Sequence, residues 1–149
     1  MYRATTSPHH RHGSFPGAYA ASTSGMPKRS WICCRDRVIV TDALNSRIQV
    51  FTPKGEHLLS FGEFGTTEGT LFRPAGLAIF AGDRILVGDN YFGSIQLFAA
   101  RGGYLGVLCG PKGLPLALEN PVSLAARGGM VYVLETGAGR LSIYRIEGR

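Results

Sequence analysis

Short runs in which apolar and polar residues alternate, separated by Gly, Pro, Asp and Asn, fill the chain from residue 31 onward. Val, Ile, Leu and Phe dominate these runs, and a period of two over short runs bounded by such residues is typical of β-strands joined by tight turns. Residues 31–34 lie where the first strand of the first repeat would be. The pattern predicts strands at 38–41, 48–51, 57–61, 76–80, 84–88, 94–98, 104–108, 121–126, 130–134 and 141–146.

The strand pattern repeats along the chain. Val-Thr-Asp at 40–42 recurs as Val-Gly-Asp at 87–89 and as Val-Leu-Glu at 133–135, at intervals of 47 and 46 residues. Further equivalent positions are Gly55 and Gly102, and Pro74 and Pro121. A period of this length with four strands is typical of a β-propeller blade. We therefore expect an all-β fold, a partial propeller of two and a half to three four-stranded blades, with repeats at about 31–74, 75–121 and 122–149.

The first repeat carries a specific motif, with Val38, Val40, Asp42, Asn45 and Arg47 followed by Ile-Gln-Val-Phe and then a glycine. It closely resembles the NHL repeat, the blade of NHL-type β-propellers. The resemblance covers about residues 31–149 and weakens toward the C-terminus.

The later repeats depart from the motif. In the second repeat, Asp89 is retained, while Phe92 and Ser94 stand at the Asn and Arg positions. In the third repeat, Glu135 replaces the Asp, and Arg140 keeps the Arg position.

The polar motif residues have two interpretations. In the structural one, Asp42, Asn45 and Arg47 satisfy turn amides and bridge to one another, and Asp89, Glu135, the paired glycines and the paired prolines maintain the repeat. In the functional one, the loops at 42–47, 89–94 and 135–140 emerge on one rim and form a contact surface for a partner. The candidate residues of this rim are Asn45, Arg47, Tyr91, Phe92 and Arg140.

The composition fits the strand pattern. Glycine accounts for 21 of 149 residues and charged residues for only 17%, as expected for many turns between short strands.

The sequence shows no set of residues suited to catalysis. Some related propellers are metal-dependent enzymes, but the repeats contain a single histidine, His57, expected at an outer edge. We expect no metal, no cofactor and no enzymatic activity, because no nucleophile–base pair or phosphate-binding loop is evident.

Residues 1–30 differ from the rest. They are rich in Ser, Thr, Pro, Gly and His and lack an apolar period. They contain four basic residues and no acidic residue, so they contribute +4 of the chain's net charge of +6. We expect a disordered basic tail, and we interpret the cluster at His9, His10 and His12 as part of this polar tail rather than as a metal site. The three cysteines, Cys33, Cys34 and Cys109, are expected to be reduced thiols, and a cytoplasmic location without membrane attachment is favoured.

The number of blades raises a question of closure. Propellers have about 4–8 blades, so the smallest needs about 160 residues at this period, whereas 119 residues follow the tail. Two alternatives remain open. Two chains join head to tail in a closed ring of about six blades, or the chain is an open fragment.

The resemblance implies a recognition module. Propellers of tripartite-motif NHL ubiquitin ligases select substrates, and other NHL propellers bind single-stranded RNA. With three cysteines in all, this chain cannot form the two zinc sites of a RING domain. We expect a non-catalytic protein-interaction scaffold, a substrate-recognition or adaptor element in ubiquitin-dependent degradation. The alternative is an RNA-binding propeller, which the near-neutral repeat region disfavours.

Overall fold

The computed structural model describes residues 2–6, 31–34 and 36–147, and for residues 6 and 31–34 it describes the backbone alone. These residues form twelve strands and one short 3-10 helix, η1 (Ala43–Asn45). The strands are β1 (Tyr2–Thr6), β2 (Trp31–Cys34), β3 (Arg37–Asp42), β4 (Arg47–Phe51), β5 (His57–Phe61), β6 (Pro74–Phe80), β7 (Arg84–Asp89), β8 (Ser94–Phe98), β9 (Tyr104–Cys109), β10 (Pro121–Arg127), β11 (Met130–Glu135) and β12 (Arg140–Glu147).

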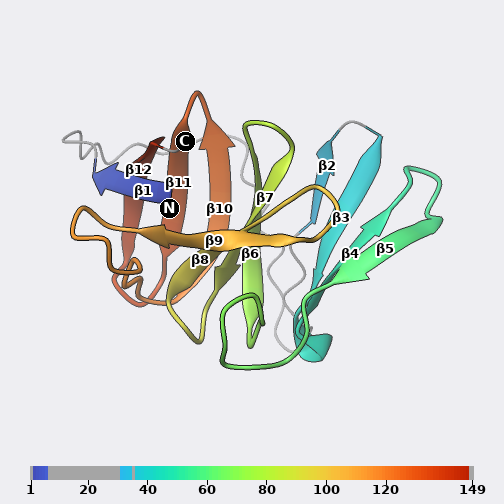
Figure 1. Cartoon of the computed structure of the whole chain (residues 1–149), viewed down its shortest axis with the longest axis horizontal. Helices are drawn as coiled ribbons and strands as arrows, with labels where there is room; N and C mark the ends of the chain where they lie inside the picture. The colour runs from blue at the N-terminus through green and yellow to red at the C-terminus, as the bar shows by residue number, and fades with distance from the viewer. Residues whose placement is uncertain (1, 7–30, 35, 148–149) are drawn as a thin grey trace.

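The described strands group into three antiparallel four-stranded blades that lie side by side, and a parallel contact between β1 and β9 links two of the blades into one eight-stranded sheet (Figure 1). Blade 1 has the order β2-β3-β4-β5, blade 2 the order β6-β7-β8-β9, and blade 3 the order β10-β11-β12-β1. The all-β, propeller-like fold class is confirmed, and the described residues make up three blades. Each predicted strand is present, and residues 31–34 form the first strand of blade 1.

The prediction of disorder throughout residues 1–30 is wrong for Tyr2–Thr6. These residues form β1, which pairs antiparallel with β12 and supplies the fourth strand of blade 3. At Tyr2 and Arg3, β1 also pairs parallel with β9, so it connects blade 3 to the outer strand of blade 2 (Figure 1). The sequence of β1 lacks a distinctive apolar alternation, and the two neighbouring strand edges provide its partners. The remainder of the predicted tail, with its three histidines, lies outside the described residues.

Turn residues hold the repeat in register. Gly55 and Gly102 have φ values of 88° and 87°, and each donates its N–H to the carbonyl three residues earlier. At Gly102 a Cβ would lie 2.5 Å from Cβ of Phe61, so glycine is required there both by conformation and by space. Pro74 and Pro121 begin the inner strands β6 and β10, and a register shift follows each proline.

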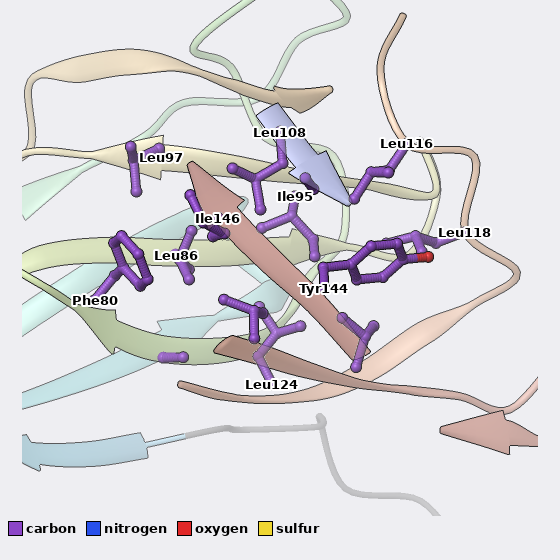
Figure 2. Close-up of a cluster of buried hydrophobic side chains, with 14 residues drawn as sticks. Phe80, Leu86, Ile95, Leu97, Leu108, Leu116, Leu118, Leu124, Tyr144 and Ile146 are labelled. Atoms are coloured by element: carbon purple, nitrogen blue, oxygen red, sulfur yellow. The ribbon is translucent and has the colours of Figure 1, made fainter. Parts of the chain in front are cut away.

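Two hydrophobic clusters lie between the blades. One joins blades 1 and 2 through Ile39, Ile48, Val50, Leu71, Leu77, Ile85, Val87 and Phe98. The other joins blades 2 and 3 (Figure 2) and includes Ala4 of β1, Leu86, Ile95, Leu97, Leu108, Leu124, Val131, Val133, Tyr144 and Ile146. Every residue of β8 is buried, because blade 2 has a neighbour on both faces. Burial between blades therefore stabilises the fold.

Replacing Ala4 with Asp tests whether β1 is a structural strand. Ala4 is fully buried, so we expect Ala4→Asp to lower the free energy of unfolding by about 2 kcal/mol or more, the cost of burying an unpaired charge. Thr5→Asp is the matched control, because Thr5 is only partly buried and pairs with Arg145. Urea denaturation of both variants measures the difference. Equal stability of the two variants would contradict the placement of β1.

Candidate protein-binding face

The motif carboxylates occupy the same place in each blade. Asp42, Asp89 and Glu135 end the second strands and pair in register with the first residue of the following strand. The loops that follow them, at 43–46, 90–93 and 136–139, therefore lie at one end of the blades. The segments that enter the inner strands reach the same end, because Pro74 pairs with Asp89 and Pro121 with Glu135. We call this end the loop face.

In blade 1, side chains satisfy the carboxylate. Asn45 Nδ2 donates to both oxygens of Asp42 at 2.9 Å, and Arg47 Nε and Gln49 Nε2 each donate to Oδ2 at 2.9 Å. Burial tends to raise the pKa of Asp42, but the hydrogen bonds of Asn45, Arg47 and Gln49 and the charge of Arg47 outweigh it and lower the pKa below its ordinary value. Asn45 and Arg47, predicted as rim residues, thus contact the carboxylate of their own loop.

In blade 2, backbone amides take over this role. Asp89 is fully buried, and its Oδ2 accepts from the N–H groups of Phe72 and Arg73 at 2.7 and 3.0 Å. Its Oδ1 accepts from the N–H groups of Tyr91 and Phe92 at 2.9 and 3.3 Å. Asp89 therefore ties the loop after β7 to the segment before β6.

In blade 3, both kinds of donor are combined. Glu135 is fully buried and accepts from Arg140 at 3.0 and 3.2 Å, from Ser142 Oγ, and from the N–H of Glu119 at 2.8 Å. Burial tends to raise the pKa of Glu135, but the hydrogen bonds from Arg140, Ser142 and Glu119 and the charge of Arg140 lower it overall. Arg140, the third predicted rim arginine, is thus paired, although its side chain is 49% exposed.

The other two predicted rim residues, Tyr91 and Phe92, belong to a group of four aromatic rings. Tyr91 stacks on Phe72 with a centroid distance of 3.9 Å and an interplanar angle of 18°. Phe64 lies against Phe72 at 4.9 Å, and Phe92 meets both Tyr91 and Phe72 edge-on. Phe64 is 68% exposed and Tyr91 60% exposed. We call Phe64, Phe72, Tyr91 and Phe92 the aromatic cluster.

The sequence interpretation did not include Phe64 and Phe72. Both lie in the connection between blades 1 and 2, outside the repeated loops. Leu71, which is fully buried, anchors this connection, and its N–H donates to the carbonyl of Glu63 at 2.9 Å. Phe64 could have been singled out from the sequence, because it lies between Gly62 and Gly65, where no strand is predicted that would bury an apolar side chain.

A depression of about 520 Å³ adjoins the cluster on the loop face. It lies among the ends of the three blades, and Tyr91 forms part of both the cluster and the wall. Asn90 Oδ1 is buried there with no hydrogen-bond donor among the described residues. The lining residues are Ala43, Leu44, Arg73, Pro74, Ala75, Asn90, Tyr91 and Asn120. The depression thus offers apolar contact, one aromatic ring, one guanidinium and one buried acceptor.

Other candidates for chemistry lie apart. His57 lies on β5, the outer strand of blade 1, and its Nε2 is 2.8 Å from Ser60 Oγ. Cys109 is a buried free thiol, and the side chains of Cys33 and Cys34 lie outside the described part. Within the described ranges, no three His, Cys, Asp or Glu residues gather closely enough to hold a metal ion. Among these residues there is likewise no helix with the length and apolarity to cross a membrane.

Comparison with known proteins supports a likeness to NHL proteins over part of the chain. No protein-family model matches the chain. Over 77 residues, 50% of the chain, it is 34% identical to Protein brain tumor of Drosophila melanogaster, an NHL-repeat protein. The chain spans only 7% of that relative's length.

Solved structures share the fold. A Bacteroides thetaiotaomicron VPI-5482 protein of unknown function superposes with a TM-score of 0.59 at 18% identity, over 74% of this chain and 32% of that one. Glutaminyl cyclase of Myxococcus xanthus superposes with a TM-score of 0.60 at 12% identity, over 84% of this chain and 57% of that one. At these identities the likeness concerns the fold.

The lowered pKa values of Asp42 and Glu135 predict acid sensitivity. A carboxyl whose pKa is lower in the folded state stabilises the fold above its unfolded pKa of about 4, and this stabilisation is lost as the pH falls toward the folded value. We expect the free energy of unfolding to decrease from pH 5 to pH 3. In Glu135→Gln the decrease should be smaller, because one of the two groups no longer titrates. Urea denaturation at each pH measures it, and equal slopes for both proteins would contradict the assignment.

Proposed function

We propose that this chain is a non-catalytic protein-interaction propeller whose loop face binds an extended, partly apolar peptide segment of a partner. The observation that carries the proposal is the aromatic cluster, with Phe64 and Tyr91 more than half exposed. Exposed rings held rigidly by stacking on a neighbour are typical of residues that dominate binding energy at protein interfaces.

The surroundings of the cluster support a peptide as ligand. The adjoining depression accommodates a side chain, and its lining residue Asn90 holds a buried Oδ1 with no hydrogen-bond donor among the described residues. Leu44 of η1, 79% exposed, extends the apolar surface across the depression. An apolar surface with a few polar groups at its border fits an extended, partly apolar peptide.

Substituting Tyr91 tests this function. A peptide-display library is selected against the purified chain, and the affinity of the selected peptides is measured by calorimetry. We expect Tyr91→Ala to weaken binding about tenfold or more, equivalent to about 1.4 kcal/mol or more. Leu105→Ala is the matched control, since Leu105 is 43% exposed on β9, outside the aromatic cluster. Equal affinities of the two variants, with unchanged thermal stability, would contradict the proposal.

The RNA alternative has one observation in its favour, the exposed Tyr91 ring beside the exposed Arg73 at the depression. Against it, Arg47 and Arg140 are both paired with carboxylates, which reduces the positive charge available to phosphates. Titration with a single-stranded oligonucleotide at several salt concentrations distinguishes the two. Tight binding with a steep salt dependence, lost in Tyr91→Ala, would favour RNA over protein.

The finer proposal is that the bound partner is a substrate or component of a ubiquitin ligase, which the resemblance to NHL propellers supports. If the chain acts as an adaptor, adding it to a reconstituted ligase reaction increases ubiquitination of the peptide-bearing partner, and Tyr91→Ala abolishes the increase. An unchanged rate with the wild-type chain would contradict the adaptor role and leave the peptide-binding function in place.

A further inference from the structure

Equivalent positions in the three blades show which face of each blade meets which neighbour. In blade 2, Ile85, Val87 and Phe98 belong to the cluster shared with blade 1. On the opposite face, Leu86, Ile95 and Leu97 belong to the cluster shared with blade 3. All six side chains are at most 1% exposed. We call these two kinds of surface the front face, toward the preceding blade, and the back face, toward the following blade.

A front face packs against a back face twice within the chain. Between blades 1 and 2, the back-face residues Ile39, Ile48 and Val50 meet the front face of blade 2. Between blades 2 and 3, the back face of blade 2 meets the front-face residues Val131, Val133 and Tyr144. The same apolar pairing thus recurs at both contacts, with closely packed aliphatic and aromatic residues on either side.

The back face of blade 3 carries the same pattern, but no described blade packs against it. Tyr132 pairs with Ile143 as Leu86 pairs with Leu97, and Leu134 pairs with Leu141 as Gly88 pairs with Ile95. Tyr132, Leu141 and Ile143 are only partly buried, whereas the blade 2 equivalents are fully buried. Leu134 is 43% exposed. The described residues therefore leave the apolar back face of blade 3 incompletely covered.

The front face of blade 1 is the complement. Val38 pairs with Phe51 as Ile85 pairs with Phe98, and Val40 stands at the position of Val87. These three side chains are also only partly buried. The two incompletely covered faces lie at opposite ends of the row of blades, with blade 2 between them (Figure 1).

We infer that a second copy of this chain covers both faces, with blade 1 of each copy docking on blade 3 of the other. The contact is heterologous, front face to back face, and the two identical contacts close a ring of six blades, within the range of known propellers. The pairing is the one that the chain forms twice within itself, so it requires no new kind of surface. This inference does not depend on the proposed peptide binding, which concerns the loop face.

The test is the mass of the full chain in solution together with two charge variants. We expect light scattering over a concentration series to give twice the chain mass of 16.0 kDa. Leu134→Glu, on the back face of blade 3, and Val40→Lys, on the front face of blade 1, should each raise the dimer dissociation constant at least tenfold. Circular dichroism confirms that each variant folds, and Leu105→Glu on β9 is the control that should remain dimeric.

Mixing the two variants is the most direct test of the pairing between blade 1 and blade 3. A mixed pair has one native contact and one Lys–Glu contact, so we expect the dimer to re-form on mixing Leu134→Glu with Val40→Lys. Four results would overturn the inference: a monomer at all concentrations, an open series of masses, disruption by Leu134→Glu but not by Val40→Lys, or no recovery on mixing. A monomer would mean that another segment or partner covers the two faces.

Discussion

The carboxylate at the end of the second strand, fully buried in blades 2 and 3 and partly buried in blade 1, is the constraint on which the loop face depends. A carboxyl group withdrawn from water needs hydrogen-bond partners, and each blade provides them from the residues that shape its loop. Asp42 uses side chains of its own loop and the next strand, Asp89 uses four backbone amides, and Glu135 uses both kinds. At Asp89 the same interaction fixes Phe72 and Tyr91, so the stacked rings of the aromatic cluster follow from the position of one carboxylate.

This arrangement explains how one motif gives loops of different character. In blade 1, the polar side chains of Asn45 and Arg47 satisfy the acid. In blade 2, Phe92 and Ser94 stand at these positions, so backbone amides satisfy Asp89 and the loop side chains are released to form an apolar surface. Gln96, the counterpart of Gln49, no longer contacts the acid and instead bonds Gly69 and Thr70 of the connection from blade 1. The departure from the motif and the exposed aromatic cluster are therefore two results of the same change.

Much of the fold could be predicted from the sequence, because strands and turns depend on residues that are close together in the sequence. The alternation of Val38, Val40 and their counterparts, with glycines at 55 and 102, determined strand positions and the four-stranded blade. The strand at Tyr2–Thr6 could not be predicted, since it depends on edges provided by residues more than a hundred positions away. For the site, Tyr91 and Phe92 could be singled out from their place in the repeat. Phe64 and Phe72 join them only through the folded connection between blades, which periodicity does not describe.

The central claim is that the strand-end carboxylate holds the loop face together, and hydrogen exchange of individual backbone amides tests it most directly. In Asp89→Ala, the amides of Phe72, Arg73 and Tyr91 should lose protection together, because they share one acceptor. Amides of β4, in the neighbouring blade, should keep theirs. Unchanged protection at these three amides, with the blades still folded, would contradict the claim.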